Sequence, residues 1–117
     1  MKTALTSAAL ALSCLLAACA ENAPAKRTAQ KADFERGMRV YQATCGVCHE
    51  SGRNGAPSLE DVEEWDERSL EWTSLMKDHV THGFMGMTAQ GGRARLSEQD
   101  IADALYYMTI KIRAEEN

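Results

Sequence analysis

The chain has 117 residues, with 13 lysines and arginines against 17 aspartates and glutamates, so its formal net charge is -4 at pH 7. This acidic balance argues against nucleic-acid binding and against a polybasic membrane patch. A chain of this length holds one domain, near the lower limit for a self-sufficient hydrophobic core.

Residues 1–18 are typical of a bacterial export signal of the lipoprotein type. Met1-Lys2 is a short positive start and residues 4–18 are almost wholly apolar, too short a stretch for the spanning helix of a mature domain. Residues 16–19 resemble a lipobox, in which Cys19 becomes the lipid-bearing first residue; cleavage within residues 18–20 by ordinary signal peptidase is the alternative. We therefore expect a lipid-anchored protein on the periplasmic side of a membrane, or a soluble periplasmic one.

Residues 19–32 are predicted to be the lipid anchor and a flexible tether for a domain at residues 33–117. Between Glu21 and Lys31 small, polar and charged residues predominate, and no large apolar residue occurs. A random coil of about a dozen residues spans roughly 20 Å, which is enough to let a small domain swing above a membrane.

The first helix of the domain is predicted at residues 33–44, because Phe34, Met38 and Tyr41 recur at i, i+4 and i+7. It ends at Cys45-Gly46-Val47-Cys48-His49, a C-x-x-C-H run that is typical of covalent c-type haem attachment. Two thiols at this spacing can add to the two vinyl groups on one side of a porphyrin, while the adjacent imidazole reaches the iron. We expect one haem c on Cys45 and Cys48, with His49 as an iron ligand.

Two other roles for the cysteine pair are less favourable. A structural zinc site needs four ligands, usually supplied as two such pairs, and the mature chain has no second pair. A thioredoxin-like redox pair belongs beside a βαβ pattern, and nothing in the sequence alternates strands with helices.

An acidic stretch follows the haem motif. Six of the eight positions from 60 to 67 are acidic: Glu60, Asp61, Glu63, Glu64, Asp66 and Glu67. A solvated loop or a helix start, where acids are favoured, explains this stretch. A docking face for a basic partner is the alternative, since complementary charge raises encounter rates.

Two further helices complete an all-α prediction. Leu75, Met76 and Val80 share one side of a helix at residues 69–81, and a helix at 98–113 repeats apolar residues at i, i+4, i+7 and i+11 from Ile101. Ser97 and Asp100 resemble a capping box at its start. Glycines mark the loops, and no strand pattern of useful length appears.

In this order and spacing the motifs resemble the class I cytochrome c family, in particular its small bacterial cytochrome c5 branch, over residues 33–108. Besides the haem motif, the resemblance is carried by Gly37, Tyr41, Gly55-Ala56-Pro57, Trp65, Arg68, His79, Gly83-Phe84, Met87, Gly91-Gly92 and Tyr106-Tyr107. Thr88 stands where the family often has proline after its ligand methionine, and a further cysteine pair of some members is absent. The resemblance implies three to five helices around one covalently bound haem c.

The resemblance also implies the second iron ligand. Met87 matches the family's ligand by its distance from Phe84 and from the glycine pair at 91–92. Met85, His79 and His82 remain alternatives, since the glycine at 86 leaves the loop pliable. Met38, Met76 and Met108 follow helical spacing and are expected to fill the core.

Further haem contacts follow from the resemblance alone. The Pro57 carbonyl accepts a hydrogen bond from the proximal histidine in the family, and Trp65 and Arg68 match positions that approach a haem propionate. A partly buried aromatic and a solvated charge are the alternative roles of that pair. Tyr41 and either Tyr106 or Tyr107 are expected to pack where the terminal helices cross, with Gly37 permitting close approach.

Together these features predict a one-electron carrier of a bacterial respiratory chain that meets redox partner proteins and is not itself an enzyme. A cytochrome subunit bound within a dehydrogenase or oxidase complex is one alternative. A haem-based ligand-binding sensor is another, if the methionine loop is weak or displaced from the iron.

Overall fold

The computed structural model describes residues 23–68, 73–92 and 95–116 of the chain. The predicted export signal and Cys19 lie outside these residues. The described part contains, in order, α1 (Ala23–Ala43), α2 (Gly46–His49), α3 (Val62–Glu67), α4 (Thr73–His82) and α5 (Glu98–Glu115). Two 3₁₀ turns at Arg53–Gly55 and Ala89–Gly92 join them, and an isolated bridge between Phe84 and Met87 is the nearest approach to a strand in the described ranges. The all-α prediction is confirmed.

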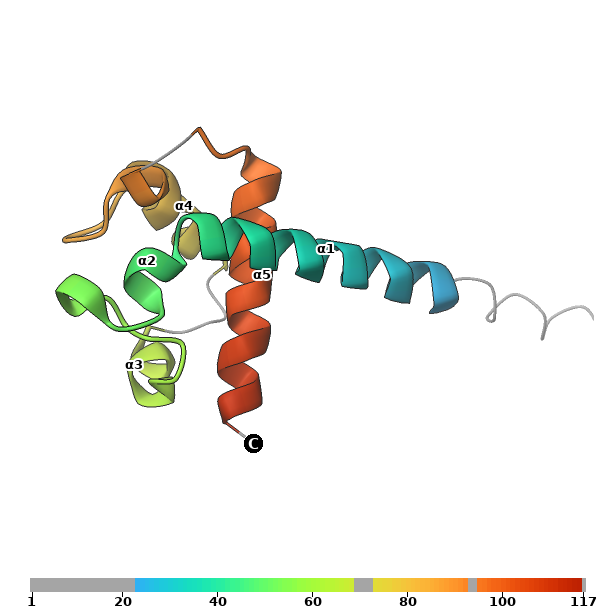
Figure 1. The fold of residues 1–117 in the computed structure, drawn as a ribbon, viewed down its shortest axis with the longest axis horizontal. Coiled ribbons are helices and arrows are strands. Elements are labelled where there is room, and N and C mark those ends of the chain that lie inside the picture. Colours follow the sequence, from blue (N-terminus) through green and yellow to red (C-terminus); the bar gives the residue numbers. More distant parts are fainter. Residues whose placement is uncertain (1–22, 69–72, 93–94, 117) are drawn as a thin grey trace, which may run out of the picture.

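The two long helices cross, and the short ones gather on one side of the crossing. Figure 1 shows α1 passing across α5, with α2, α3 and α4 on the side of α5 toward which the C-terminal end of α1 points. The contact between α1 and α5 is the most extensive between any two of the described elements. No described helix is both long enough and apolar enough to cross a membrane.

Gly37 makes the close crossing of α1 and α5 possible. A Cβ atom at this position would lie 2.0 Å from the backbone oxygen of Asp103 on α5, a distance that no side chain tolerates. The ring of Tyr107 packs beside this point, 5.1 Å from that of Phe34 and 5.2 Å from that of Tyr41. The predicted crossing is confirmed, and Tyr107 is the second tyrosine of the pair with Tyr41.

A buried carboxylate also joins the two helices at the crossing. Asp103 is 3% exposed, and its oxygens accept hydrogen bonds from Arg36 Nε on α1 and from Gln99 Nε2, the latter at 2.8 Å. The hydrogen bond to Asp103 raises the pKa of Arg36, so the guanidinium stays charged. Because a buried charge is expensive without partners, this network favours one register of α1 on α5.

The predicted flexible tether is wrong from residue 23 onward. Helix α1 begins ten residues before the predicted start at Asp33, and the described side chains at 26–31 are exposed on the part of α1 that projects away from the other helices (Figure 1). Alanine, lysine, arginine and glutamine are good helix formers, and Pro24 falls in the first turn, where a missing N–H does not matter. An ion pair of 3.8 Å between Lys31 and Glu35 spans the expected boundary. The lack of apolar residues therefore did not indicate disorder in the part of this segment from residue 23 onward.

The remaining helix ends agree closely with local signals. Ser97 and Asp100 form the predicted capping box: Asp100 N donates to Ser97 Oγ at 3.1 Å, and Ser97 N donates to Asp100 Oδ2 at 3.0 Å. Helix α5 runs two residues beyond its predicted end, and α4 ends one residue later than predicted. Residues 69–72 of the predicted third helix lie outside the described residues.

The acidic stretch contains a helix that was not predicted as one. Asp61 is the N-cap of α3 and accepts a hydrogen bond from Glu64 N at 3.3 Å, with Glu63 and Glu64 in the first turn. Negative charge at a helix N-terminus is favourable, which fits the helix-start interpretation of this stretch.

Replacing Gly37 by alanine tests the helix crossing. In an exposed helix this change is stabilising by about 1 kcal/mol. Here the new methyl group collides with backbone, so we expect the free energy of unfolding to fall by about 1–3 kcal/mol. Guanidinium denaturation of the holoprotein measures it. Gly86→Ala is the control, because a Cβ there meets nothing within 4 Å; equal losses in both variants would contradict the crossing.

Candidate haem site

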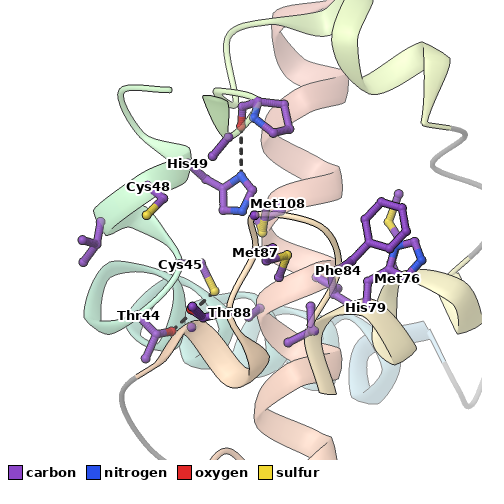
Figure 2. A pocket seen from close by; sticks show the side chains of 18 of the residues that line it. Thr44, Cys45, Cys48, His49, Met76, His79, Phe84, Met87, Thr88 and Met108 are labelled. Atoms are coloured by element: carbon purple, nitrogen blue, oxygen red, sulfur yellow. Dashed lines mark hydrogen bonds between the residues drawn. The ribbon is translucent and has the colours of Figure 1, made fainter. Parts of the chain in front are cut away.

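The single turn of α2 places the cysteine pair and His49 on one wall of a cavity. Cys48 N and His49 N both donate to the Cys45 carbonyl, at 3.1 and 3.0 Å, so the turn closes tightly on itself. Both thiols are free and half-buried (Figure 2). Burial raises the pKa of the Cys45 thiol, against a weaker opposite effect of its contact with Thr44. The buried position of Cys45 thus disfavours its charged thiolate form.

The orientation of His49 leaves one ring nitrogen free for a ligand. The side chain is buried, and its Nδ1 lies 2.9 Å from the Pro57 carbonyl oxygen, as the dashed line in Figure 2 shows. A carbonyl oxygen only accepts, so Nδ1 carries the proton and Nε2 holds an unshared pair. A histidine held in this way is a well-oriented neutral ligand for iron.

Residues 57–59 make two hydrogen bonds to His49 and a third to Trp65, whose ring packs beside that histidine. Besides the Pro57 contact, Leu59 N donates to the His49 carbonyl at 3.1 Å, and the Ser58 carbonyl accepts from Trp65 Nε1 at 2.7 Å. The Trp65 ring is buried with its centroid 5.8 Å from that of His49. Trp65 thus supports the histidine, and its single N–H is already bonded to Ser58. Its role toward a haem propionate stays a prediction.

Arg68 also lines the cavity, but its guanidinium is hydrogen-bonded to Glu64 of α3. Its Nη1 donates to the Glu64 carbonyl at 2.6 Å and to the Glu64 carboxylate. The side chain lines the cavity beside Trp65. Arg68 as a propionate partner likewise stays a prediction.

A tight hairpin brings a methionine to the other side of the cavity. Phe84 N donates to the Met87 carbonyl at 3.0 Å and Met87 N donates to the Phe84 carbonyl at 2.8 Å. The hairpin is entered through Gly83 at φ +86, where a Cβ would come within 3.0 Å of the Met87 oxygen. Met85 lies at the tip and is 94% exposed, whereas Met87 packs against the buried cluster that includes Val80. The geometry therefore favours Met87 over Met85 as a ligand.

The two histidines of α4 differ in their surroundings. The His79 ring lines the cavity but is stacked on the Phe84 ring, with centroids 3.9 Å apart (Figure 2). His82 is exposed, and its Nδ1 contacts Asp78 Oδ1 at 2.9 Å. The ring of His79 is thus engaged by Phe84, and that of His82 by Asp78.

The cavity between these two walls has a volume of about 520 Å³, within the range of cofactor pockets. Members of two buried clusters line it: Trp65 and Met108 of one, and Val80, Ile101 and Leu105 of the other. Its lining is mainly apolar, with two thiols and one imidazole at one wall and a thioether at the other. This donor set fits a haem c, which the thiols would bind covalently and the imidazole and thioether would ligate.

Several residues that line the cavity were not predicted to do so from the sequence. Thr44, Leu96 and Ala104 line the cavity, and Thr88 lies on its wall, with its carbonyl accepting from Gly91 N at 3.2 Å. Ala104 follows Ile101 by one helical turn, so its position on the apolar face of α5 was a readable signal. The others belong to loops, where no periodicity shows which side chains face inward.

Such a cavity, with a paired thiol attachment site and a histidine beside it, defines a haem c-binding protein. Residues 32–108 match the family model described as "Cytochrome C oxidase, cbb3-type, subunit III". The chain belongs to this family of class I cytochromes c, and its cofactor is covalently bound haem c.

Known relatives span most of the folded part. A cytochrome c-555 of Chlorobaculum tepidum is 31% identical over 65% of this chain and 74% of its own length. A cytochrome c-555 of Prosthecochloris aestuarii is 29% identical over 74% of this chain and 96% of its own length. A cytochrome c6 of Bumilleriopsis filiformis is 33% identical over 66% of this chain and 90% of its own length.

Removal of the attachment residues tests the site. The double variant Cys45→Ala/Cys48→Ala should lose all covalent haem, because no thioether can form, and His49→Ala should yield little or no holoprotein. Denaturing electrophoresis with haem staining and a visible spectrum measure both. His82→Ala is the matched control, since that ring faces solvent; a spectrum lost in this control would contradict the site.

Proposed function

We propose that this protein carries single electrons through a haem c whose axial ligands are His49 and Met87. The supporting observation is that α2 and the hairpin present these two side chains to the same apolar cavity, while Met85 faces solvent. Bound haem c supplies one-electron chemistry by cycling between ferrous and ferric iron. The family membership of the chain supports the same function.

The protein's own residues suit this task in three ways. The Pro57 carbonyl accepts a hydrogen bond from the Nδ1–H of His49, which makes Nε2 a better electron-pair donor to iron. A Met87 thioether favours the reduced state and occupies the position that an outside ligand would take. The apolar lining excludes water and disfavours the additional charge of the oxidised state. The residues of the site thus position and tune a carrier, and we assign no enzymatic role to it.

The acidic surface of α3 is the proposed docking face for a basic redox partner. Asp61, Glu63, Glu64 and Glu67 are exposed together on one side of this helix. Trp65 and Arg68 of the same segment line the haem cavity, so a partner bound there would stand near the cofactor. Complementary charge gives fast and short-lived encounters, which suit a shuttling carrier.

A bound subunit of an oxidase is the second candidate function. The description of the matching family model, a subunit of a cbb3-type oxidase, favours it. The same haem site serves either function, so co-purification distinguishes them. A shuttling carrier separates from membrane complexes in mild detergent, whereas a subunit remains with its complex.

We further propose that the protein lies on the periplasmic side of a bacterial membrane, with a lipid on Cys19. Native protein should fractionate with membranes, while Cys19→Ser should be released or left unprocessed with its haem domain still folded. Mass spectrometry of the mature N-terminus measures this. An unlipidated N-terminus would contradict the anchor and favour a freely soluble carrier.

Paired methionine variants test the proposed ligand. Met87→Ala should lose the weak far-red absorption of iron–methionine bonding, bind carbon monoxide when reduced, and have a lower reduction potential. Met85→Ala should keep the unmutated protein's spectrum and its inertness to carbon monoxide. Absorption spectra and redox titration of both holoproteins measure these effects.

Each alternative has a distinct outcome in these variants. The reverse pattern would transfer the ligand to Met85 and leave the carrier function standing. Ready binding of carbon monoxide by the unmutated reduced protein would contradict His/Met ligation and favour a haem-based sensor.

A further inference from the structure

The hairpin that carries Met87 is attached to the rest of the protein at few points. It consists of one bridge between Phe84 and Met87, and Met85 at its tip adopts a positive φ of 50° and is almost fully exposed. The ring of Phe84 is itself 49% exposed. Burial therefore contributes little at the outer half of this hairpin, and another contact has to hold it against the cavity.

His79 supplies that contact in two ways. Its ring is stacked on Phe84 with centroids 3.9 Å apart and planes at 12°, a nearly parallel arrangement (Figure 2). Its backbone carbonyl accepts a hydrogen bond from Gly83 N at 2.9 Å, at the entry to the hairpin. His79 thus contacts the hairpin twice, at the backbone of Gly83 and at the ring of Phe84.

We propose that His79 is a positioning residue, which clamps the Met87 hairpin to α4 by stacking on Phe84 and so keeps the sixth iron position closed. The two backbone hydrogen bonds between Phe84 and Met87 couple these residues, so holding Phe84 in place also holds Met87. This inference rests on the proposed function, in which Met87 is the iron ligand.

The expected size of the effect follows from the strength of aromatic pairs. Loss of such a pair corresponds to a factor of about 2 to 10 in the equilibrium between closed and open hairpin. An outside ligand binds iron only in the open form, so its apparent affinity rises in proportion to the open fraction.

Imidazole binding to the ferric holoprotein is the first measurement. In His79→Ala the apparent affinity should rise by about 2- to 10-fold. His82→Ala is the matched control, because His82 belongs to the same helix but contacts Asp78 rather than the hairpin. An equal rise in both variants, or none in His79→Ala while Met87 is the ligand, would overturn the clamp.

Two further variants separate stacking from general damage to α4. His79→Phe keeps a flat ring and should restore the low affinity for imidazole, whereas failure of this rescue would show that stacking is not the cause. Phe84→Ala should reproduce the effect from the other partner. The double variant His79→Ala/Phe84→Ala should add nothing to either single one; additive effects would mean that the two rings act separately.

Amide exchange of Met87 tests the clamp independently of iron ligation. The Met87 N–H is bonded to the Phe84 carbonyl, so its hydrogen exchange requires the hairpin to open. It should be faster by about 2- to 10-fold in His79→Ala and unchanged in His82→Ala. Faster exchange without a change in imidazole affinity would support the clamp and overturn Met87 as ligand, whereas unchanged exchange would overturn the clamp.

Discussion

The close approach of α1 and α5 at Gly37 is the constraint on which the haem site depends. Helix α1 leads directly into Cys45 and α2, and α5 supplies Ile101, Leu105 and Met108 to the cavity. The distance between these helices therefore sets how far the two cysteines lie from the apolar side chains of α5 that line the cavity. A side chain at position 37 would separate them, which explains why the smallest residue stands opposite the backbone of Asp103.

The two walls of the cavity are held with unequal strength. His49 is fixed by the Pro57 contact, by the Leu59 hydrogen bond and by the buried ring of Trp65. Met87 packs against the cluster of Val80, but it comes from a short hairpin whose outer part is exposed and in which Phe84 stacks on His79. A haem attached through Cys45 and Cys48 would belong to the wall of His49. In the proposed function, the less firmly held methionine wall is then the one at which an outside ligand would enter.

The exposed half of α1 is a rigid extension of the domain rather than the flexible segment that was predicted. A flexible tether allows free rotation, whereas a helix continuous from Ala23 to Ala43 transmits orientation into the domain. The haem motif lies at the end of α1 opposite to this projection (Figure 1). Helix α1 thus places the haem motif at the end of the helix opposite to residue 23.

Local patterns predicted those parts of the protein that depend on near neighbours in the chain. The spacing of Cys45, Cys48 and His49, the apolar faces of α1 and α5, and the capping box of Ser97 and Asp100 each need only a few residues to be specified. The start of α1 differs from the prediction because helix propensity rather than apolar content decides that segment. Only the helix-start interpretation of the acidic stretch anticipated α3, because six residues carry too little periodicity to predict a helix. The crossing at Gly37 came from the family resemblance rather than from any local pattern.

The sequence by itself was enough to predict haem attachment at residues 45–49 and an all-helical domain around it, since covalent chemistry and helical periodicity are properties of short segments. Only the tertiary structure decided that Met87 faces the cavity while Met85 faces solvent, that Trp65 gives its N–H to Ser58, and that His79 stacks on Phe84. These choices depend on a hairpin and on loops whose side-chain directions are set by contacts between distant segments. Spacing favours Met87 only through the family resemblance, because by local chemistry alone either side of a pliable loop can turn inward until the rest of the fold selects one.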